Sequence, residues 1–516
     1  MTAKTARKLG LKESYTLMTR DLAWDTTYQP MDKVYPQVAY EGLKIHDWDK
    51  WEDPFRLTMD AYWKYQAEKE RKLYAIMDAF SQSNGHLTVS DARYINTLKL
   101  FLNGVSPLEY MAHRGFAHAA RSLPGAGPRV ACMMQSLDEI RHSTTQIHAM
   151  SNYNKYYNGM HDWNHMHDRV WYLSVPKSFF EDAVSAGPFE FLVAIGFSFE
   201  YVLTNLLFVP FVSGAAYNGD MATMTFGFSA QSDEARHMTL GLELIKFILE
   251  QDPDNVPIVQ KWIDKWNWRG YRMLTLVAMM MDYMLPKRVM SWKEAWEVYY
   301  EENGGALFKD LARYGIRPPQ WIDQIEKEKD HLSHQAWAVF YNYSAASNFH
   351  AWAPSKEDMD WLASKYPDTF DQYYRPRYEF WAEEEAKGNR FYNKTLPMLC
   401  QTCQIPMFFT EPGDPTKLAY RESDYKGDKY HFCSDGCKHI FDNEPEKYIQ
   451  SWLPVHQIYQ GNCFNEGADP TAEGFDPLMA VLAYYNINVG RDNFDYKGSE
   501  DEKNFNMWRN AATSNS

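Results

Sequence analysis

Two copies of the motif D-E-x-R-H constrain the fold of this chain more than any other feature. The first copy spans Asp138–His142 and the second spans Asp233–His237. On an α-helix, residues three apart lie on one face, so the Glu and the His of each copy can bind the same metal ion. Two such helices, with one further Glu from each of two others, form the dimetal site of a carboxylate-bridged four-helix bundle. The motif pair therefore predicts a bundle built around two metal ions.

The two remaining glutamates are expected on the helices that precede the motifs. Glu109 lies 30 residues before the first motif's Glu, and Glu200 lies 34 residues before the second motif's Glu. A strong break, Pro124–Pro128, separates the first pair and the turn Asn218–Asp220 separates the second, so both offsets suit antiparallel hairpins. Four carboxylates balance two divalent cations, and mixed carboxylate and imidazole ligation suits iron that activates dioxygen. The predicted iron ligands are Glu109, Glu139, His142, Glu200, Glu234 and His237.

Residues around the motifs are candidates for supporting roles. The Asp and Arg of each motif suit a layer behind the ligands, in which the Asp accepts a hydrogen bond from the second ring N–H of a ligand histidine. The alternative is that the Asp and the Arg, three residues apart, simply pair with each other along the helix. These residues are Asp138, Arg141, Asp233 and Arg236. Apolar side chains near the ligands suit an apolar substrate, although core packing explains any single one more simply. They include Ala112, Phe197, Phe199, Leu203 and Phe208.

Three further positions near the predicted ligands carry specific expectations. Thr204 follows Glu200 by one helical turn, so its hydroxyl can face the site and handle protons, or else bond to its own backbone. Gln146 follows His142 by one turn and points toward the same site. Pro107, two residues before Glu109, removes a backbone donor, so a kink or bulge is expected there.

A second metal motif lies near the C-terminus. Cys400 and Cys403 form a close pair, Cys433 and Cys437 form another, and 29 residues separate the pairs. Two thiolate pairs at this spacing indicate a tetrahedral, structural zinc site. The other two cysteines, Cys132 and Cys463, are isolated, and no function is expected for them.

Composition excludes several classes of protein. The chain has 516 residues, with 68 acidic and 53 basic side chains and a net charge of −15, which argues against nucleic-acid binding. Six cysteines cannot form a disulfide framework, so a reducing cytoplasm is expected. No secretory signal is apparent. The apolar stretch Phe189–Ala216 contains Glu200 near its centre, which favours a buried core helix over a membrane span.

Helical periodicity covers most of the chain, with helices expected near Asp60–Ala79, from Ser90 or Asp91 to Leu123, and onward through Tyr343. Short segments, turns and cysteines replace this pattern after Pro397. The expected divisions are an N-terminal arm and helix, a di-iron helical domain, a helical connector, the zinc module and a C-terminal segment, at residues 1–85, 86–345, 346–395, 396–450 and 451–516.

Several long stretches resemble the large hydroxylase subunit of bacterial multicomponent phenol hydroxylases, within the di-iron monooxygenases that include toluene and methane enzymes. The resemblance rests on FSFEYVLTNLLFVPF, SAQSDEARHMTLG and QSLDEIRH, and it covers nearly the whole chain. It implies a mainly α fold, with a ferritin-like four-helix bundle inside a larger helical body. The six predicted ligands match the family pattern, and Thr204, Asn205 and Gln231 match polar active-site positions. The run YHFCSDGCKHIFDNEPEKYI resembles a YHS/TRASH-type treble-clef knuckle.

The resemblance also implies a reaction and its partners. Di-iron and O2 would hydroxylate phenol and methylphenols to catechols, with NADH electrons from a flavin and iron–sulfur reductase. The chain itself has no dinucleotide-binding G-x-G-x-x-G and no plant-type cysteine array. Two further hydroxylase subunits in a dimer of trimers and a small regulatory protein would complete the system. The alternatives are a hydroxylase of another substrate class, such as toluene, alkanes or alkenes, and a non-enzymatic ferritin-like iron protein.

Overall fold

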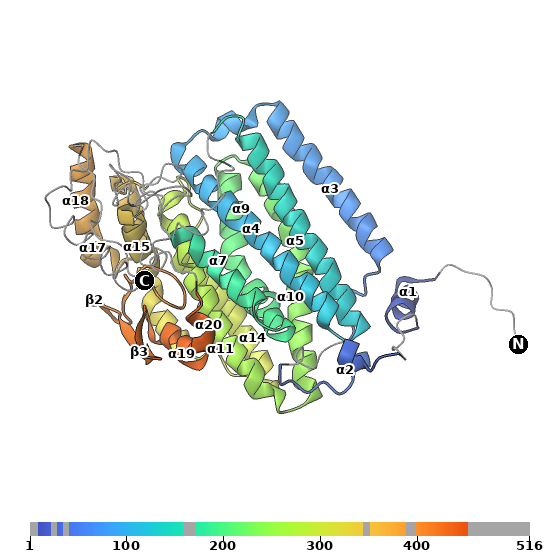
Figure 1. The fold of residues 1–516 in the computed structure, drawn as a ribbon. Helices are drawn as coiled ribbons and strands as arrows, with labels where there is room; N and C mark the ends of the chain where they lie inside the picture. Colours follow the sequence, from blue (N-terminus) through green and yellow to red (C-terminus); the bar gives the residue numbers. More distant parts are fainter. Residues whose placement is uncertain are drawn as a thin grey trace, which may run out of the picture.

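The protein is predominantly helical, as the computed structural model shows (Figure 1). The structure describes residues 9–21, 28–34, 41–157, 160, 171–343, 351–388 and 399–451. Most of the expected C-terminal segment, 451–516, lies outside the described residues, and so does Cys463. Strands occur, within the described ranges, only between residues 410 and 432. The mainly α fold class predicted from the sequence is therefore confirmed.

A four-helix bundle forms the centre of the molecule. Its helices are α4 (Ala92–Ser122), α5 (Ala126–Tyr153), the continuous helix 188–217 and α10 (Met221–Gln251). The helix 188–217 consists of α8 (Pro188–Phe191), the π-helical segment η5 (Leu192–Leu203) and α9 (Thr204–Tyr217). The helices α4 and α5 form one hairpin, and η5 with α9 packs against α10 in the other. This arrangement is the expected pair of antiparallel hairpins.

Local sequence signals fix where these helices begin. The Asp91 carboxylate accepts a hydrogen bond from the backbone N–H of Arg93 (2.8 Å), so the expected N-cap is present. The Asp220 carboxylate does the same for Thr223 (3.0 Å) at the start of α10. Gly219, with φ of +84°, provides the left-handed residue that the turn before α10 requires. These caps fix the start of α4, which carries Glu109, and the start of α10, which carries the second motif.

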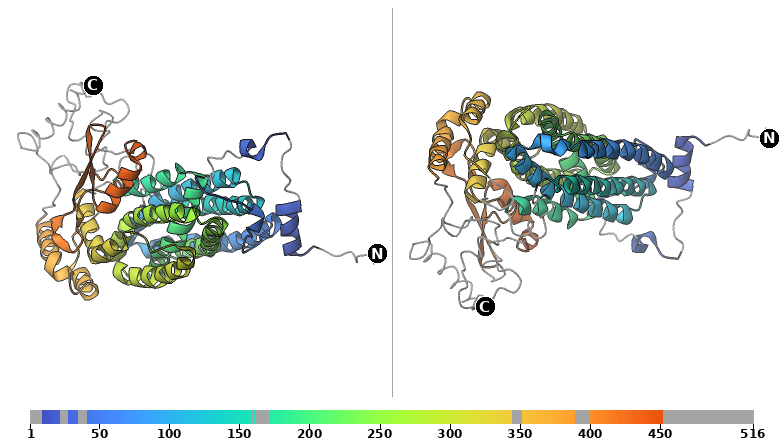
Figure 2. Two further views of the ribbon diagram at one scale, coloured as in Figure 1. Left: turned by 90° about the horizontal axis from the view of Figure 1, so that it is seen from below. Right: turned by 90° about the horizontal axis from the view of Figure 1, so that it is seen from above.

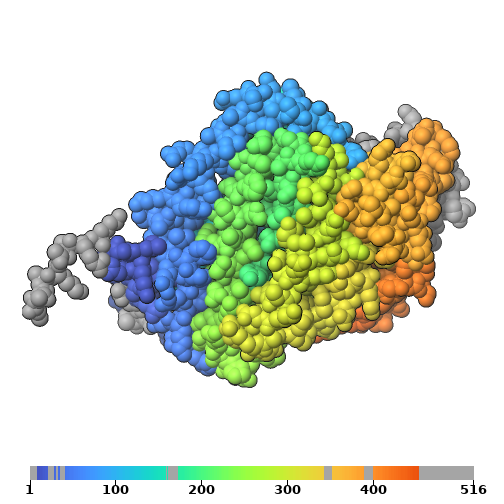
Figure 3. Space-filling model, turned by 180° about the vertical axis from the view of Figure 1, so that it is seen from behind, coloured from blue at the N-terminus to red at the C-terminus, as the bar shows by residue number. Residues whose placement is uncertain are grey.

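Further helices cover the bundle on its outer faces. The helix α3 (Met59–Gln82) packs on α10 and α5, α7 (Trp171–Val184) packs on α4, and α11 (Asn255–Met273) packs on η5. On the face shown in Figure 3, the chain runs across the surface from the blue N-terminal helices through green to orange. The remaining elements before the cysteine module are α1 (Leu11–Thr16), η1 (Leu17–Asp21), α2 (Met31–Val34), η3 (Trp48–Lys50), η4 (Gly85–Val89), α12 (Thr275–Met279), η6 (Met280–Met284), α13 (Trp292–Trp296), η7 (Glu297–Glu302), α14 (Asn303–Leu311), η8 (Ala312–Tyr314), α15 (Ile322–Tyr343), α16 (Lys356–Lys365), α17 (Phe370–Tyr373) and α18 (Arg375–Ala386).

The helix 188–217 is long and apolar enough, by composition, to cross a membrane, but its most apolar window is 78% buried inside the protein. This burial confirms the expectation of a core helix. Its first turn is capped by Glu41, whose carboxylate accepts hydrogen bonds from the backbone N–H groups of Phe189 (2.6 Å) and Glu190 (3.2 Å). The N-terminal arm thus helps to hold the central helix.

The cysteine module consists of two short antiparallel hairpins followed by helices. Its elements are β1 (Thr410–Glu411), β2 (Asp414–Leu418), β3 (Arg421–Tyr425), β4 (Asp428–Phe432), α19 (Asp435–Asn443) and α20 (Pro445–Tyr448). Strand β1 pairs with β2, and β3 pairs with β4. Both views of Figure 2 place this module and α15–α18 at one end of the bundle, opposite the N-terminal helices. The module packs on α11 through α19.

The sequence predicts an irregular helical turn at Pro107, but the irregular turn lies in a different helix of the bundle. The helix α4 remains α-helical through Pro107, so the bulge expected there is not found. Among the four bundle helices, the π-helical segment is η5 instead, and it contains Glu200. Outside the bundle, η1, η6 and η7 are also π-helical. A π turn holds about one extra residue per turn and is frequent at functional sites, which directs attention to Glu200.

The segment η5 and α10 approach each other so closely that their contact requires glycine. A Cβ built on Gly241 would lie only 2.1 Å from the carbonyl oxygen of Gly196 in η5. Backbone atoms cannot move aside as a flexible side chain can. This contact therefore fixes the distance between the helix that carries Glu200 and the helix that carries Glu234.

Replacing Gly241 with Ala should destabilise the protein by about 1–3 kcal/mol, because the added methyl group overpacks a backbone contact. Thermal or denaturant unfolding measures this change. Gly305→Ala in α14 is the matched control, since nothing lies within 4 Å of its built Cβ. There the gain in helix propensity should raise stability by up to about 1 kcal/mol. Equal stability of the two variants would contradict the close approach.

Candidate metal centres and active site

Carboxylate and imidazole side chains gather inside the four-helix bundle. In the described part of the chain, two such groups have ligand atoms within 4.8 Å of one another: Glu109, Glu139 and His142, and Glu139, Glu234 and His237. All of these side chains are buried. Because Glu139 belongs to both groups, it lies between two positions that could each hold a cation. The two D-E-x-R-H motifs and Glu109 therefore meet in space as their spacing predicted.

Glu200 lies at the edge of this arrangement. It is buried on η5, and it lines the same cavity as Glu109, Glu139 and Glu234. Among the described residues it belongs to neither three-residue ligand group. Its Oε2 accepts a hydrogen bond of 2.6 Å from the side-chain amide of Gln135. The structure thus brings the sixth predicted ligand to the site, although Glu200 stands outside the two close groups that the other five form.

The aspartate of each motif contacts the histidine of the other motif. The Nε2 atom of His142 lies 3.1 Å from Asp233, and the Nε2 atom of His237 lies 3.1 Å from Asp138. A carboxylate that accepts the Nε2 proton leaves Nδ1 as the ring nitrogen with a free lone pair. Both Nδ1 atoms face the group of glutamates, at 3.2 to 3.7 Å from their oxygens. Each motif therefore orients the histidine of the other.

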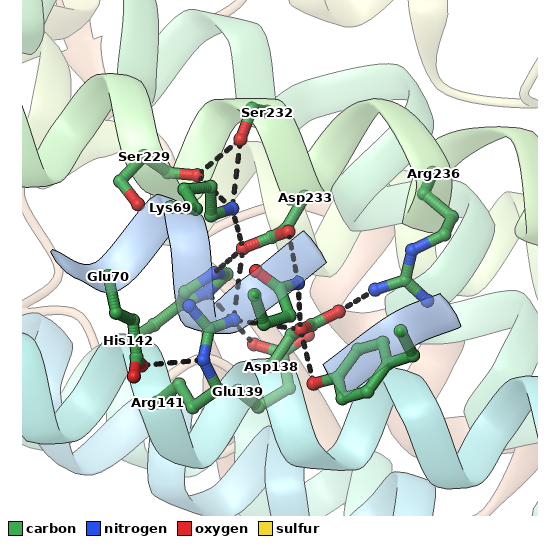
Figure 4. Close-up of polar contacts among 12 residues, drawn as sticks. Lys69, Glu70, Asp138, Glu139, Arg141, His142, Ser229, Ser232, Asp233 and Arg236 are labelled. Carbon is green, nitrogen blue, oxygen red and sulfur yellow. Dashed lines mark hydrogen bonds and ion pairs between the residues drawn. The ribbon is translucent and has the colours of Figure 1, made fainter. Parts of the chain in front are cut away.

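The helix α3 completes the layer behind the histidines (Figure 4). The Gln66 amide donates to both Asp138 and Asp233, at 2.8 Å each, and the Tyr62 hydroxyl donates to Asp138 at 2.7 Å. Lys69 forms an ion pair with Asp233. The motifs and their spacing do not identify these three residues. The sequence does contain a signal for them. Positions 62, 66 and 69 are spaced by four and three residues, so their polar groups lie on one face of an amphipathic helix.

The two motif arginines also lie in this layer. Arg141 donates to Glu70 at 2.7 Å and to Asp138 at 3.0 Å, and Arg236 forms an ion pair with Asp138. Burial raises the pKa of the Asp233 carboxyl, but the hydrogen bond to His142 and the charge of Lys69 outweigh burial and hold that pKa well below its usual range. An ionised aspartate is a strong acceptor for the imidazole N–H.

The site has the electrostatics of a cation-binding cluster. Burial raises the pKa of Glu109 to about 8, and burial together with the charges of Glu139 and Glu234 holds the pKa of Glu200 well above its usual range. Burial disfavours the charged form of His237, but the neighbouring carboxylates outweigh it and raise its pKa to about 9. Carboxyl groups whose pKa is raised, here Glu109 and Glu200, hold protons, and divalent cations can replace those protons.

An apolar cavity of about 90 Å³ adjoins the carboxylates. Four of the predicted pocket or catalytic residues line it, namely Ala112, Phe199, Thr204 and Phe208. Gln146 does not line the cavity, but its amide donates to Glu109 (3.1 Å) and accepts from Ser106 (2.8 Å). Asn205 and Gln231 are half-buried and do not appear in the described lining. Their predicted roles stay predictions.

The far wall of the cavity comes from helices that the motifs do not identify. The helices α7, α11, α12 and η6 contribute Tyr172, Leu173, Pro176, Phe180, Met273, Leu276, Val277 and Met280. These residues lie in long apolar stretches, where nothing in the sequence distinguishes a cavity wall from ordinary core. The cavity is therefore polar at the carboxylates and Thr204, and largely apolar elsewhere.

The four predicted zinc cysteines come together at the base of the β-hairpin module. Their sulfur atoms lie within 4.8 Å of one another, and all four side chains are fully buried. The sulfur of Cys433 lies 3.6 Å from that of Cys403 and 3.7 Å from that of Cys437. Burial raises the pKa of the Cys437 thiol, but hydrogen bonds from the other three thiols and the charge of Arg272 bring it well below its usual value. The group has the composition of a closed, four-thiolate metal site.

The helix α11 lies between this thiol group and the cavity. The indole N–H of Trp268 donates to the Cys437 sulfur at 3.3 Å, and a Cβ on Gly436 would collide with the same indole. On the bundle side, a Cβ on Gly270 would lie 2.4 Å from the side chain of Leu203, the residue before Thr204. Met273, one turn further along, lines the cavity. One helix thus contacts the cysteine module on one face and the site on the other.

Comparison with known proteins agrees with this geometry. The model of the methane/phenol/alkene hydroxylase family matches residues 24–252, and that of the YHS domain matches residues 409–452. The chain is 65% identical to phenol 2-monooxygenase, oxygenase component DmpN, of Pseudomonas sp. (strain CF600), over 98% of this chain and 96% of the relative. It is 25% identical to the methane monooxygenase component A alpha chain of Methylococcus capsulatus, over 80% of each chain.

Among solved structures, xenon-pressurised phenol hydroxylase from Pseudomonas sp. OX1 matches with a TM-score of 0.88 and 68% identity. The match covers 97% of this chain and all of that chain. The bundle, the buried Glu and His groups and the cysteine module are thus parts of one architecture. The chain belongs to the methane/phenol/alkene hydroxylase family of di-iron monooxygenases.

Proposed function

We propose that this chain is the oxygenase component of a multicomponent monooxygenase that hydroxylates phenol and methylphenols to catechols. One observation carries the proposal: a buried set of glutamates and oriented histidines opens directly onto an apolar cavity. The high identity to a relative named as a phenol 2-monooxygenase oxygenase component supports the substrate class. A ferritin-like iron store has no need of an apolar cavity beside its metal ligands, so the geometry favours an enzyme.

The residues present fit a pair of iron ions. The Nδ1 atoms of His142 and His237, Oε1 of Glu139 and Oε2 of Glu234 are buried without a hydrogen-bond partner among the described residues. Buried polar atoms that lack a partner are costly, unless a ligand satisfies them. We assign two iron ions to Glu109, Glu139, His142, Glu200, Glu234 and His237. When bound, the iron pair supplies the activation of O2 that transfers one oxygen atom to the ring.

The other residues of the site bind the aromatic substrate, orient the imidazoles and exclude water. The apolar wall holds an aromatic ring against the glutamates and keeps water out, which strengthens the electrostatic interactions within the site. Thr204 is the neutral hydroxyl in the lining beside Glu200, where it can hold or pass a proton. The aspartates, arginines and α3 residues keep both imidazoles in the orientation that exposes Nδ1.

Electrons must come from other components, because the chain carries no nucleotide-binding motif or iron–sulfur cysteine array of its own. The proposed partners are an NADH-dependent flavin and iron–sulfur reductase, a small regulatory protein and two further hydroxylase subunits in a dimer of trimers. The component names of the relatives support a multicomponent system. We propose a cytoplasmic location, where a reducing environment keeps the four buried thiols available for one structural zinc ion.

Replacing Glu234 with Ala should abolish hydroxylation, because it removes one of the proposed ligands beside His237. Catechol formation from phenol, with NADH and the reconstituted components, should fall by at least about 100-fold, and bound iron should fall with it. Glu243→Ala, on the same helix but partly exposed, is the control and should keep both. Retention of iron and turnover in Glu234→Ala would refute the ligand assignment. Toluene or an alkene as the preferred substrate would refute only the substrate class.

The double variant Cys400→Ser, Cys403→Ser should lose about one zinc ion per chain, because two of the four thiolates are removed. Metal analysis should find the iron content unchanged, since α11 separates the two sites. Cys132→Ser, a buried cysteine outside the module, should keep the zinc. Unchanged zinc in the double variant would show that these thiols do not bind it.

A further inference from the structure

Two buried glutamines flank the metal-ligating positions of α5. Gln135 lies four residues before Glu139, and Gln146 lies four residues after His142. On a helix these four positions form one stripe, and all four side chains are at most 5% exposed. The stripe thus runs from amide to carboxylate to imidazole to amide along the face that meets the other bundle helices.

Each amide is directed at a glutamate that belongs to neither D-E-x-R-H motif. The Gln146 amide donates to Oε1 of Glu109, on α4, at 3.1 Å. The Gln135 amide donates to Oε2 of Glu200, on η5, at 2.6 Å. A glutamine that merely filled the core would satisfy itself on the backbone or on other neutral groups. Both glutamines instead contact the two outer carboxylates of the proposed iron site, in a symmetrical arrangement.

Glu200 has more need of such a contact than Glu109. It lies in the π-helical segment, beside the like charges of Glu139 and Glu234, and it is the one proposed ligand outside both close groups of ligand atoms in the described chain. Among the described residues, the hydrogen bond from Gln135 is the one that the Glu200 carboxylate accepts. The contact with Gln135 occupies Oε2 and leaves Oε1 as the oxygen that can approach a metal ion.

The chemistry of the donor matters as well. A lysine at this position would offset part of the negative charge with which the glutamates balance the two cations. An amide donates a hydrogen bond and adds no charge. An apolar residue would leave a buried carboxylate oxygen unsatisfied. We propose that Gln135 is a positioning residue: its amide holds the Glu200 carboxylate in a single orientation at the edge of the iron site, beside the cavity. This inference rests on the proposed function.

Gln135→Met tests the role, because methionine keeps the unbranched shape and length but has no donor. The full chain, assembled with its partner components, should keep two iron ions, with a changed Mössbauer spectrum of the iron. Its kcat for phenol should fall about tenfold while its KM stays within about twofold of wild type. Gln135→Leu, which also fills the position without a donor, should change the spectrum in the same way and guards against an effect peculiar to the methionine side chain.

Gln335→Met is the matched control, since Gln335 is also buried and its amide donates to Thr410 at 2.7 Å, away from the site. It should leave the iron spectrum and kcat unchanged. A wild-type iron spectrum in both Gln135 variants overturns the proposal, as does a loss of activity that Gln335→Met reproduces with the spectrum intact. A wild-type protein that binds no iron would overturn the proposed function along with it, so the two failures are distinguishable.

Discussion

The burial of four carboxylates inside one helical bundle is the constraint on which the rest of the structure depends. Moving even one unpaired carboxylate out of water is costly, and Glu109, Glu139, Glu200 and Glu234 are all buried. The bundle meets this cost with hydrogen bonds, with imidazoles and, in the proposed function, with two divalent cations. The crossed pairs His142–Asp233 and His237–Asp138 join the two motif helices, so neither half of the site can be oriented alone.

Successive layers of the molecule extend this arrangement outward. The helix α3 brings Gln66 between the two aspartates, and the close contact of Gly196 with Gly241 sets the distance between η5 and α10. On the opposite side, α11 links the cysteine module to the cavity through Trp268 and Met273. A metal ion in the module would therefore stabilise a helix that forms part of the wall against which a substrate packs.

Much of this could be predicted from the sequence, because the relevant signals are local. Helix periodicity, the caps at Asp91 and Asp220, and the spacing of the motifs placed the bundle helices and brought five predicted ligands together. The two cysteine pairs likewise met as expected. Each of these predictions depends on residues close in sequence or on a simple antiparallel hairpin.

The remaining features depend on how distant helices pack, which one sequence does not reveal. The motif aspartates could have served either histidine, and only the packing of α5 against α10 shows that they cross. Gln135 is one of many glutamines until η5 brings Glu200 against it. Pro107 suggested a bulge beside Glu109, but α4 accommodates the proline, and the π-helical segment of the bundle forms around Glu200 instead.

In the proposed function, two iron ions occupy the space among Glu109, Glu139, His142, Glu200, Glu234 and His237. Anomalous diffraction above and below the iron absorption edge, from crystals of the full chain with its partner components, tests it most directly. Two iron peaks are predicted, one beside Glu109 and His142 and the other beside Glu234 and His237, with Glu139 between them. Iron elsewhere in the protein, a single peak, or no peak among these residues would contradict the account.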